Sequence, residues 1–224
     1  ASALSKLNIQ TSFIGNVGDD LFGSKFIKLF KDLKIDTTLF RIDTKYKTRV
    51  VEVLRDEFGD RSFLGFAKNQ FELFADENLE INFLKNNINS LNNLYSNAEF
   101  LITGTILLAS TISSESLYFL MDFAENFGLK IVIDLNWREV FWHKSLSAKS
   151  FKREDQIMKI MEFLSFADIL KLSREESEMF FGNSNPVTIS KSFQKKPPGS
   201  GVPVPGTKLG SNQSKSIVKY IGKA

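Results

Sequence analysis

The sequence predicts an α/β fold with a mostly parallel central sheet flanked by helices. Three observations carry this prediction. After residue 83, short continuous apolar runs at 100–102 and 131–133 alternate with longer segments of helical periodicity. That alternation is typical of parallel strands buried on both faces and joined by right-handed crossovers. The third observation is size, because 224 residues of which 42% are hydrophobic suffice for one sizeable core.

The N-terminal part contains the end of a helix at 1–7 and a strand–turn–helix stretch at 11–23. Phe13 and Ile14 end a short apolar run that predicts a buried strand. Gly15 and Gly18 are expected to break this strand. Either of the next two residues can cap the helix that follows (Asp19, Asp20). Such a turn lets a ligand approach the helix N-terminus, although many turns of this kind bind nothing.

The helix predicted at 21–33 carries an apolar stripe that we expect to face a sheet, formed by Phe22, Phe26, Leu29, Phe30 and Leu33. A strand at 38–42 follows. The β-branched and aromatic residues of 48–54 and 61–66, joined by a turn at 56–60, predict a half-exposed β-hairpin. Such a hairpin suits a lid that closes over a ligand and excludes water, and an edge hairpin is the alternative.

The second half of the chain is predicted as alternating helices and strands: helices at 83–94, 114–127, 153–166 and 174–181, and strands at 99–104, 130–134 and 168–172. Ligands of such folds bind beyond the carboxyl ends of the strands. Asp134, Asn136 and Arg138 follow one strand, and 173–176 follow another. We therefore expect both polar sets to face the same edge of the sheet.

The last part of the chain departs from this pattern. All five prolines lie after residue 185, and 195–214 is too rich in Pro, Gly, Ser and Lys to bury a core. We expect a domain over 1–185 and a tail over 186–224 that is disordered or of non-native origin. The tail holds seven lysines, and no acidic residue follows Glu178. Residues 1–185 therefore contain 22 Lys and Arg against 26 Asp and Glu.

Composition excludes several functional classes. The body of the chain has a net charge of −4, so we expect no nucleic-acid partner. No apolar run reaches the length of a membrane span. The chain has no cysteine and a single histidine, His143, which rules out Cys-based or His-based metal sites. These features fit a cytoplasmic protein.

Six segments, in this order, resemble the pfkB (ribokinase-like) sugar kinases, and the fructokinases most closely. They are the segment 1–7, Gly-Asp-Asp-Leu-Phe-Gly at 18–23, the segment 35–38, the hairpin at 48–63, Asp-Leu-Asn-Trp-Arg at 134–138 and the strand and acidic helix at 167–182. The resemblance covers about residues 1–185. It implies a ribokinase-like fold with a lid at about 38–66, and phosphorylation of a small sugar by ATP with Mg²⁺.

The resemblance also assigns candidate site residues. Gly15, Gly18 and Asp19 are implied on the sugar side, and Asp134, Asn136 and Arg138 in a substrate-binding loop. Ser173 and Glu176 match an Asn-x-x-Glu motif that organises the metal and phosphates, with Ser in place of Asn. For Glu176 alone, a solvated helix N-terminus is the alternative interpretation.

The sequence also departs from that family. It contains neither the Gly-Ala-Gly-Asp motif that supplies the catalytic base nor the upstream Gly-Gly segment. We therefore expect a fragment that is inactive or nearly so alone. The alternatives are a non-catalytic scaffold, or a ribokinase, adenosine-kinase or ketodeoxygluconate-kinase specificity. A homodimer that forms through the lid is also consistent with the resemblance.

Overall fold

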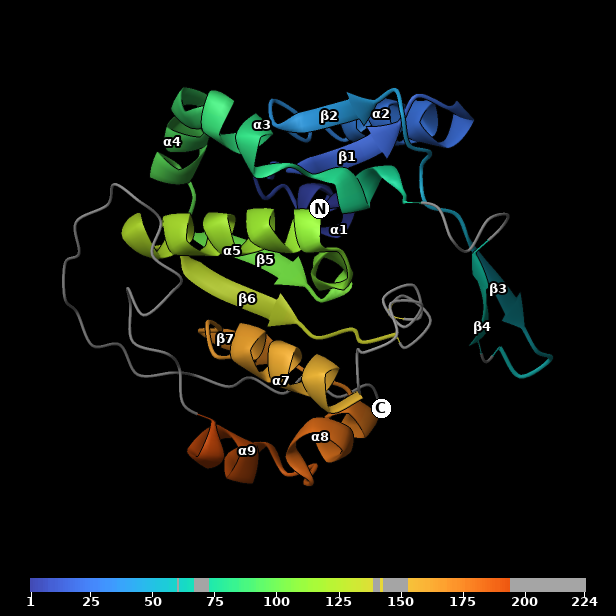
Figure 1. Ribbon diagram of the computed structural model, residues 1–224, viewed down its shortest axis with the longest axis vertical. Coiled ribbons are helices and arrows are strands. Elements are labelled where there is room, and N and C mark those ends of the chain that lie inside the picture. The colour runs from blue at the N-terminus through green and yellow to red at the C-terminus, as the bar shows by residue number, and fades with distance from the viewer. Residues whose placement is uncertain (60, 67–72, 139–141, 143–152, 194–224) are drawn as a thin grey trace. The chain divides into compact units, whose positions relative to one another are not determined.

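The computed structural model describes residues 1–59, 61–66, 73–138, 142 and 153–193 (Figure 1). The chain divides into two compact units. The first comprises Ala1–Leu94 and Ser110–Ser116, and the second comprises Tyr95–Ala109 and Leu117–Ala224.

The first unit begins with helix α1 (Ser2–Lys6), strand β1 (Gly15–Gly18), helix α2 (Leu21–Asp32) and strand β2 (Phe40–Asp43). β1 and β2 pair in parallel. The expected strand ending at Ile14 is wrong by a few residues, because Gly15 and Gly18 are the first and last residues of β1. Neither glycine has a positive φ. Gly18 is required for space instead, since a Cβ there would lie 2.5 Å from Thr48 N.

Helix α2 is capped by Asp20, whose Oδ1 accepts a hydrogen bond from Gly23 N at 2.9 Å. Its apolar stripe is less buried than expected. Phe30 is 4% exposed and packs against the rings of Phe13 and Phe40. Three other members of the stripe, Phe22, Phe26 and Leu29, are 43–46% exposed.

Strands β3 (Val51–Arg55) and β4 (Arg61–Phe66) form the predicted hairpin, antiparallel with a register shift between Glu52 and Val53. Of the expected lid at 38–66, residues Phe40–Asp43 belong instead to the sheet with β1. The short helices η1 (Ala75–Asn78), α3 (Ile81–Asn86) and α4 (Ile88–Ser96) follow. The single helix predicted at 83–94 is thus broken at Asn87, whose Nδ2 donates to Phe83 O at 2.8 Å.

The second unit contains a parallel sheet in the order β5–β6–β7, with β5 at Phe100–Gly104, β6 at Lys130–Asp134 and β7 at Ile169–Lys171. A short helix η2 (Ile106–Ala109) follows β5. Helices α5 (Thr111–Asn126) and α7 (Arg153–Leu164) make the crossovers and lie on one face of the sheet (Figure 1). Ile131 and Ile133 are fully buried. Among the described residues the other face is less covered than predicted, since Phe100 and Ile102 are 50% and 53% exposed.

Two helices close the described part of the chain. α8 (Arg174–Phe181) ends at Gly182, which has a φ of +64°. α9 (Pro186–Ser192) begins where the tail was expected to begin. Asn185 Oδ1 caps α9 and Pro186 occupies its first turn, a position that proline favours. The predicted tail therefore opens with a helix, and its remainder from 194 lies outside the described residues.

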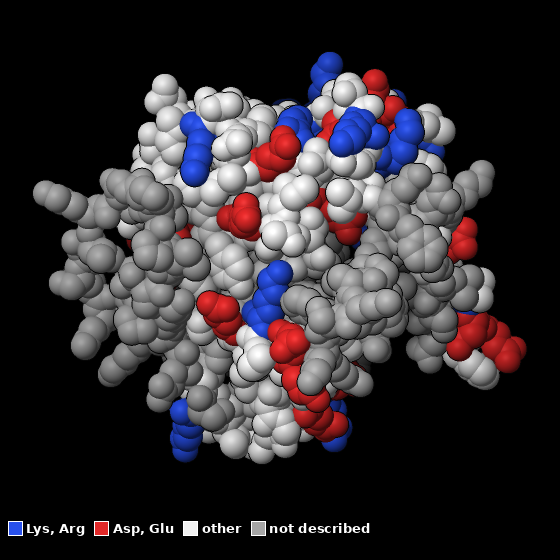
Figure 2. All heavy atoms as spheres, in the orientation of Figure 1, with Lys and Arg blue, Asp and Glu red and all other residues white. Residues whose placement is uncertain are grey.

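On the face of the molecule drawn in Figure 2, lysine and arginine are interspersed with acidic side chains. None of the helices in the described residues combines the length and hydrophobicity needed to cross a lipid bilayer.

Candidate functional site

The carboxyl edge of the β5–β6–β7 sheet brings together two of the predicted polar sets. β6 ends at Asp134, and the loop 135–138 continues from it. β7 ends at Lys171, and Ser173 then starts α8. Trp137 N donates to Glu176 Oε1 at 2.8 Å, and Arg138 Nη1 lies 4.0 Å from the same oxygen. The expectation that both sets share one edge is confirmed.

The start of α8 is a capping box. Ser173 Oγ accepts a hydrogen bond from Glu176 N at 3.2 Å, and Glu176 Oε2 accepts one from Ser173 N at 2.8 Å. Each hydrogen bond satisfies a main-chain donor that the first turn of a helix leaves free. Glu176 is 8% exposed, so it is not the solvated surface residue of the alternative interpretation.

Asp134 pairs with a residue that the sequence analysis did not single out. Asp134 Oδ2 lies 2.6 Å from Lys171 Nζ, and the two residues are register partners across β6 and β7. Lys171 had a detectable signal in the sequence, since it lies inside the strand predicted at 168–172, two residues before Ser173. Asn136 is exposed and has a φ of +39°.

Two cationic side chains at this edge are suited to phosphate, and each of them also lies beside a carboxylate, Glu176 or Asp134. Arg138 and Lys171 are both cations there, and the N-terminus of α8 adds partial positive charge. In the described part of the chain no group of three His, Cys, Asp or Glu side chains is arranged to hold a metal ion. Glu176 already accepts two main-chain N–H groups, and Asp134 is paired with Lys171. These residues do not fit direct ligation of Mg²⁺.

The predicted sugar-side residues lie in the first unit. Gly18 N donates to Thr48 Oγ1 at 2.9 Å, and Thr48 N donates to Asp20 Oδ2 at 2.8 Å. Asp19 is exposed, and its N–H donates to Asp43 O at 2.8 Å. Burial alone would raise the pKa of Asp20, but the hydrogen bonds from Gly23 and Thr48 outweigh it and hold that pKa below its ordinary value. Gly15 lies at the start of β1.

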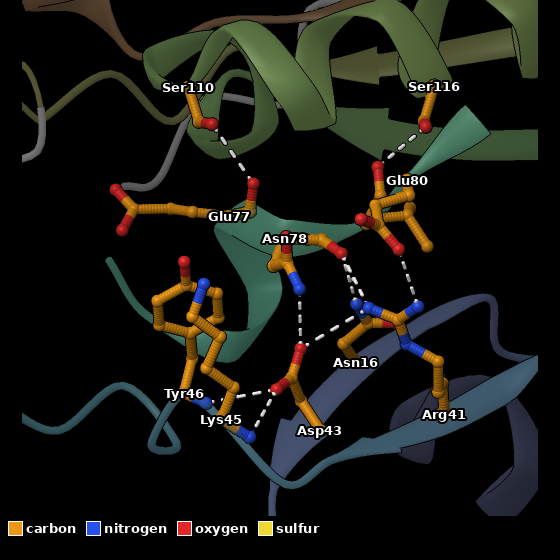
Figure 3. A network of polar contacts seen from close by, with 11 residues as sticks. Asn16, Arg41, Asp43, Lys45, Tyr46, Glu77, Asn78, Glu80, Ser110 and Ser116 are labelled. Atoms are coloured by element: carbon orange, nitrogen blue, oxygen red, sulfur yellow. Dashed lines mark hydrogen bonds and ion pairs between the residues drawn. The ribbon is translucent and has the colours of Figure 1, made fainter. Parts of the chain in front are cut away.

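A polar network that the sequence did not predict surrounds the end of β2 (Figure 3). Arg41 Nη1 donates to Glu80 Oε2 at 3.0 Å, and Nη2 contacts Asp43 Oδ2 at 3.2 Å and Asn78 O at 2.8 Å. Asp43 is 6% exposed, and its Oδ1 accepts the main-chain N–H groups of the next turn. Asn16 Nδ2 donates to Asn78 O at 2.8 Å. The network joins both strands of this sheet to η1.

A second unpredicted cluster fixes the root of the hairpin. The Arg49 guanidinium lies over the rings of Phe66 and Phe74, with Cζ 5.2 Å and 4.8 Å from their centroids. Its Nη2 lies 2.9 Å from Asp76 Oδ2 and 3.2 Å from Glu77 Oε1. Burial raises the pKa of Asp76, although Arg49 opposes that shift. Contacts between residues so distant in sequence leave no local signal.

Comparison with known proteins gives a consistent result. The profile of the pfkB family carbohydrate kinases matches residues 1–204. The chain is 25% identical over 195 residues to the probable fructokinase-7 of Arabidopsis thaliana, covering 87% of this chain and 52% of that protein. It is 26% identical over 186 residues to the fructokinase of Escherichia coli, covering 82% and 53%. The chain thus spans about half the length of the curated relatives that it matches.

Solved structures show the same fold. The fructokinase of Xylella fastidiosa with bound ATP has a TM-score of 0.68 at 23% identity, covering 84% of this chain and 53% of that one. The fructokinase of Vibrio cholerae O395 in its fructose, ADP and calcium form has a TM-score of 0.66 at 24% identity, covering 87% and 58%. The ribokinase-like α/β fold class is thereby confirmed.

Proposed function

The chain belongs to the pfkB family of carbohydrate kinases, and we propose that the whole protein is an ATP-dependent sugar kinase of the fructokinase type. The fructokinases among its relatives support fructose as the first candidate substrate. The structural observation that carries the proposal is the edge of the second unit, where 134–138 and the start of α8 meet at Glu176.

Each residue at this edge has a proposed role. Arg138 and Lys171 attract the phosphate groups of the nucleotide, and Arg138 offers a planar fork to phosphate oxygens. Ser173 and Glu176 shape the N-terminal turn of α8, and Asp134 and Asn136 line the same edge. In the first unit, Gly15, Gly18 and Asp19 shape the sugar side. ATP, when bound, supplies the phosphoryl group, with Mg²⁺ carried on its phosphates.

We expect this chain by itself to transfer phosphate very slowly. It contains no Gly-Ala-Gly-Asp segment, so the general base of the related kinases has no counterpart in it. A positioned base contributes a factor of roughly 10²–10⁴. Fructose-dependent ADP formation should therefore be at least about 100-fold slower than that of the E. coli fructokinase measured alongside. A comparable rate would overturn the claim of a missing base.

The same missing motif is equally consistent with a second candidate, a non-catalytic scaffold that binds a protein partner. Calorimetric titration with ATP separates the two, since the kinase proposal expects binding at the edge formed by Arg138 and Lys171 and the scaffold proposal does not require it. Lys171→Met should weaken ATP binding. Lys130→Met, which changes an exposed lysine at the opposite end of β6, is the matched control. The choice among fructose, ribose, adenosine and ketodeoxygluconate requires a substrate panel with the whole protein.

The hairpin of β3 and β4 is proposed to serve as the lid and as a homodimer contact. Its apolar side chains support this, because Val53, Leu54 and Phe58 are 42%, 56% and 85% exposed. Sedimentation analysis of the chain and of Phe58→Ser tests the dimer. A monomer in both cases contradicts the dimer proposal and leaves the kinase proposal standing.

A further inference from the structure

Glu176 links two segments that are distant in sequence through hydrogen bonds with their main chains. Its Oε2 accepts from Ser173 N and its Oε1 from Trp137 N, each at 2.8 Å. The side chain is 10% exposed. A buried carboxylate held by two N–H donors on different oxygens is a rigid connection, because charge-assisted hydrogen bonds are short and strong.

The loop that Glu176 holds has an unusual backbone. Asn136 has a φ of +39°, a left-handed conformation that costs free energy in a residue other than glycine. The residue before it is anchored, since Leu135 N donates to Lys171 O at 3.0 Å and Leu135 O accepts from Thr105 Oγ1 at 2.8 Å. The residue after it is anchored by Glu176. The conformation of Asn136 is therefore held from both sides.

We propose that Glu176 is a positioning residue that sets the shape of the 135–138 loop and acts on bound phosphate through that loop. This inference rests on the proposed function for its phosphate ligand. It adds a role to the one that family resemblance implies for Glu176. Each carboxylate oxygen accepts one main-chain donor, and these two hydrogen bonds couple the side chain to the loop and to the start of α8.

Arg138 is the side chain through which the loop would act. Its Nη1 donates to Trp137 O at 2.7 Å, so the guanidinium folds against the loop that carries it. The Trp137 ring packs edge-on against Phe180 of α8, with centroids 6.0 Å apart. A change in the Trp137 backbone therefore moves the guanidinium as well. Release of Trp137 N from Glu176 is the smallest change that would do this.

The first test is hydrogen exchange at the Trp137 and Ser173 amides. Glu176→Ala removes both acceptors, and Glu176→Gln keeps the shape but places an amide NH₂ against one of the donors. We expect the exchange rate of the Trp137 amide to rise about tenfold or more in Glu176→Ala and less in Glu176→Gln. The matched control is Glu178→Gln, which changes an exposed glutamate of the same helix that pairs only with Arg174 among the described contacts. Unchanged exchange at Trp137 in both Glu176 variants overturns the proposal.

The second test separates positioning from metal organisation. ATP is titrated calorimetrically into wild type and Glu176→Gln, once with Mg²⁺ and once with a chelator. The positioning role predicts the same factor of lost affinity in both conditions, and a loss seen only with Mg²⁺ overturns it. If the wild type binds no ATP in either condition, the proposed binding of nucleotide phosphates at this edge fails. The exchange experiment then still decides whether Glu176 holds the loop, and if Glu176→Ala does not fold, Glu176→Gln carries both tests.

Discussion

At the scale of single residues, Gly18 shows most directly how close packing shapes the first unit. A Cβ at this position would lie 2.5 Å from Thr48 N and 2.7 Å from Tyr46 O, and real Cβ atoms do not approach backbone so closely. Gly18→Ala should therefore destabilise the chain by about 1–3 kcal/mol. Urea unfolding measures this loss. Ser24→Ala, an exposed change on α2, is the control and should stay within about 0.5 kcal/mol of wild type. Equal urea midpoints for Gly18→Ala and wild type would show that the backbone at 46–48 moves to make room for the added methyl group.

Asp20 should give the stability of the chain a dependence on acid pH. Its hydrogen bonds outweigh burial and keep its pKa below the ordinary value, about 3.9. A carboxyl with a lowered folded pKa stabilises the fold above its unfolded pKa, and this contribution is lost as the pH falls through the folded value. Asp20→Asn should therefore be less stable than wild type at pH 7, by about 1 kcal/mol. The difference should shrink below about pH 4. Urea midpoints at pH 7 and pH 3 measure it, and a difference that does not change with pH would contradict the assignment.

At the scale of elements, Arg49 determines whether the hairpin has a rigid root. Its side chain is 9% exposed and pairs with Glu77, which is 3% exposed. Arg49→Ala removes the cation from a buried ion pair and should cost about 3–5 kcal/mol. Arg49→Lys keeps the charge but loses the planar contact with Phe66 and Phe74, so its effect should be intermediate.

Two measurements check this prediction for Arg49. Urea unfolding gives the loss of stability, and hydrogen exchange of the β3 amides reports whether the hairpin root loosens. Arg55→Ala, an exposed change within the hairpin, is the control and should have little effect. If Arg49→Ala leaves exchange in β3 unchanged, the hairpin is held by other contacts.

The elements that sequence predicted best are those with local start and stop signals. β6 and α8 have the predicted bounds, because an apolar run and Gly182 mark their limits. β1 was misplaced because its glycines were interpreted as breakers. The role of Gly18 depends on Thr48, thirty residues away, which no local pattern reveals. The helix predicted at 83–94 is divided at Asn87, the C-cap of α3, and periodicity does not detect this division.

The candidate site, like the elements, was predictable only where a local pattern or a general rule of the fold applies. The general rule for parallel sheets places Asp134 and Ser173 at one edge, and the structure agrees. The rule does not say which atoms meet there. The partners of Glu176 are main-chain N–H groups, and every residue except proline carries one, so the sequence gives no sign of them. Resemblance supplied one role for this residue, and the hydrogen bonds add a second, which is to hold the 135–138 loop.

At the scale of the whole chain, the question with the most consequence is where the folded domain ends. The sequence places this limit at residue 185, but the family profile matches as far as residue 204 and α9 occupies Pro186–Ser192. Ile189 of α9 is 1% exposed, and Phe193 is 9% exposed and packs against the ring of Phe181. Apolar burial of this extent belongs to a core rather than to a solvated tail.

Two truncations separate these limits. Ending the chain after residue 185 removes the burial of Ile189 and Phe193, which should cost about 3 kcal/mol or more in stability, since a fully buried large apolar side chain contributes about 1.5–3 kcal/mol. Ending it after residue 193 removes only the Pro-, Gly-, Ser- and Lys-rich part, and we expect no change in the urea midpoint. If both truncations are as stable as the full chain, the folded domain ends at residue 185. Loss of stability in both would mean that the segment after 193 contributes to the fold, and it would contradict the non-native origin predicted for it.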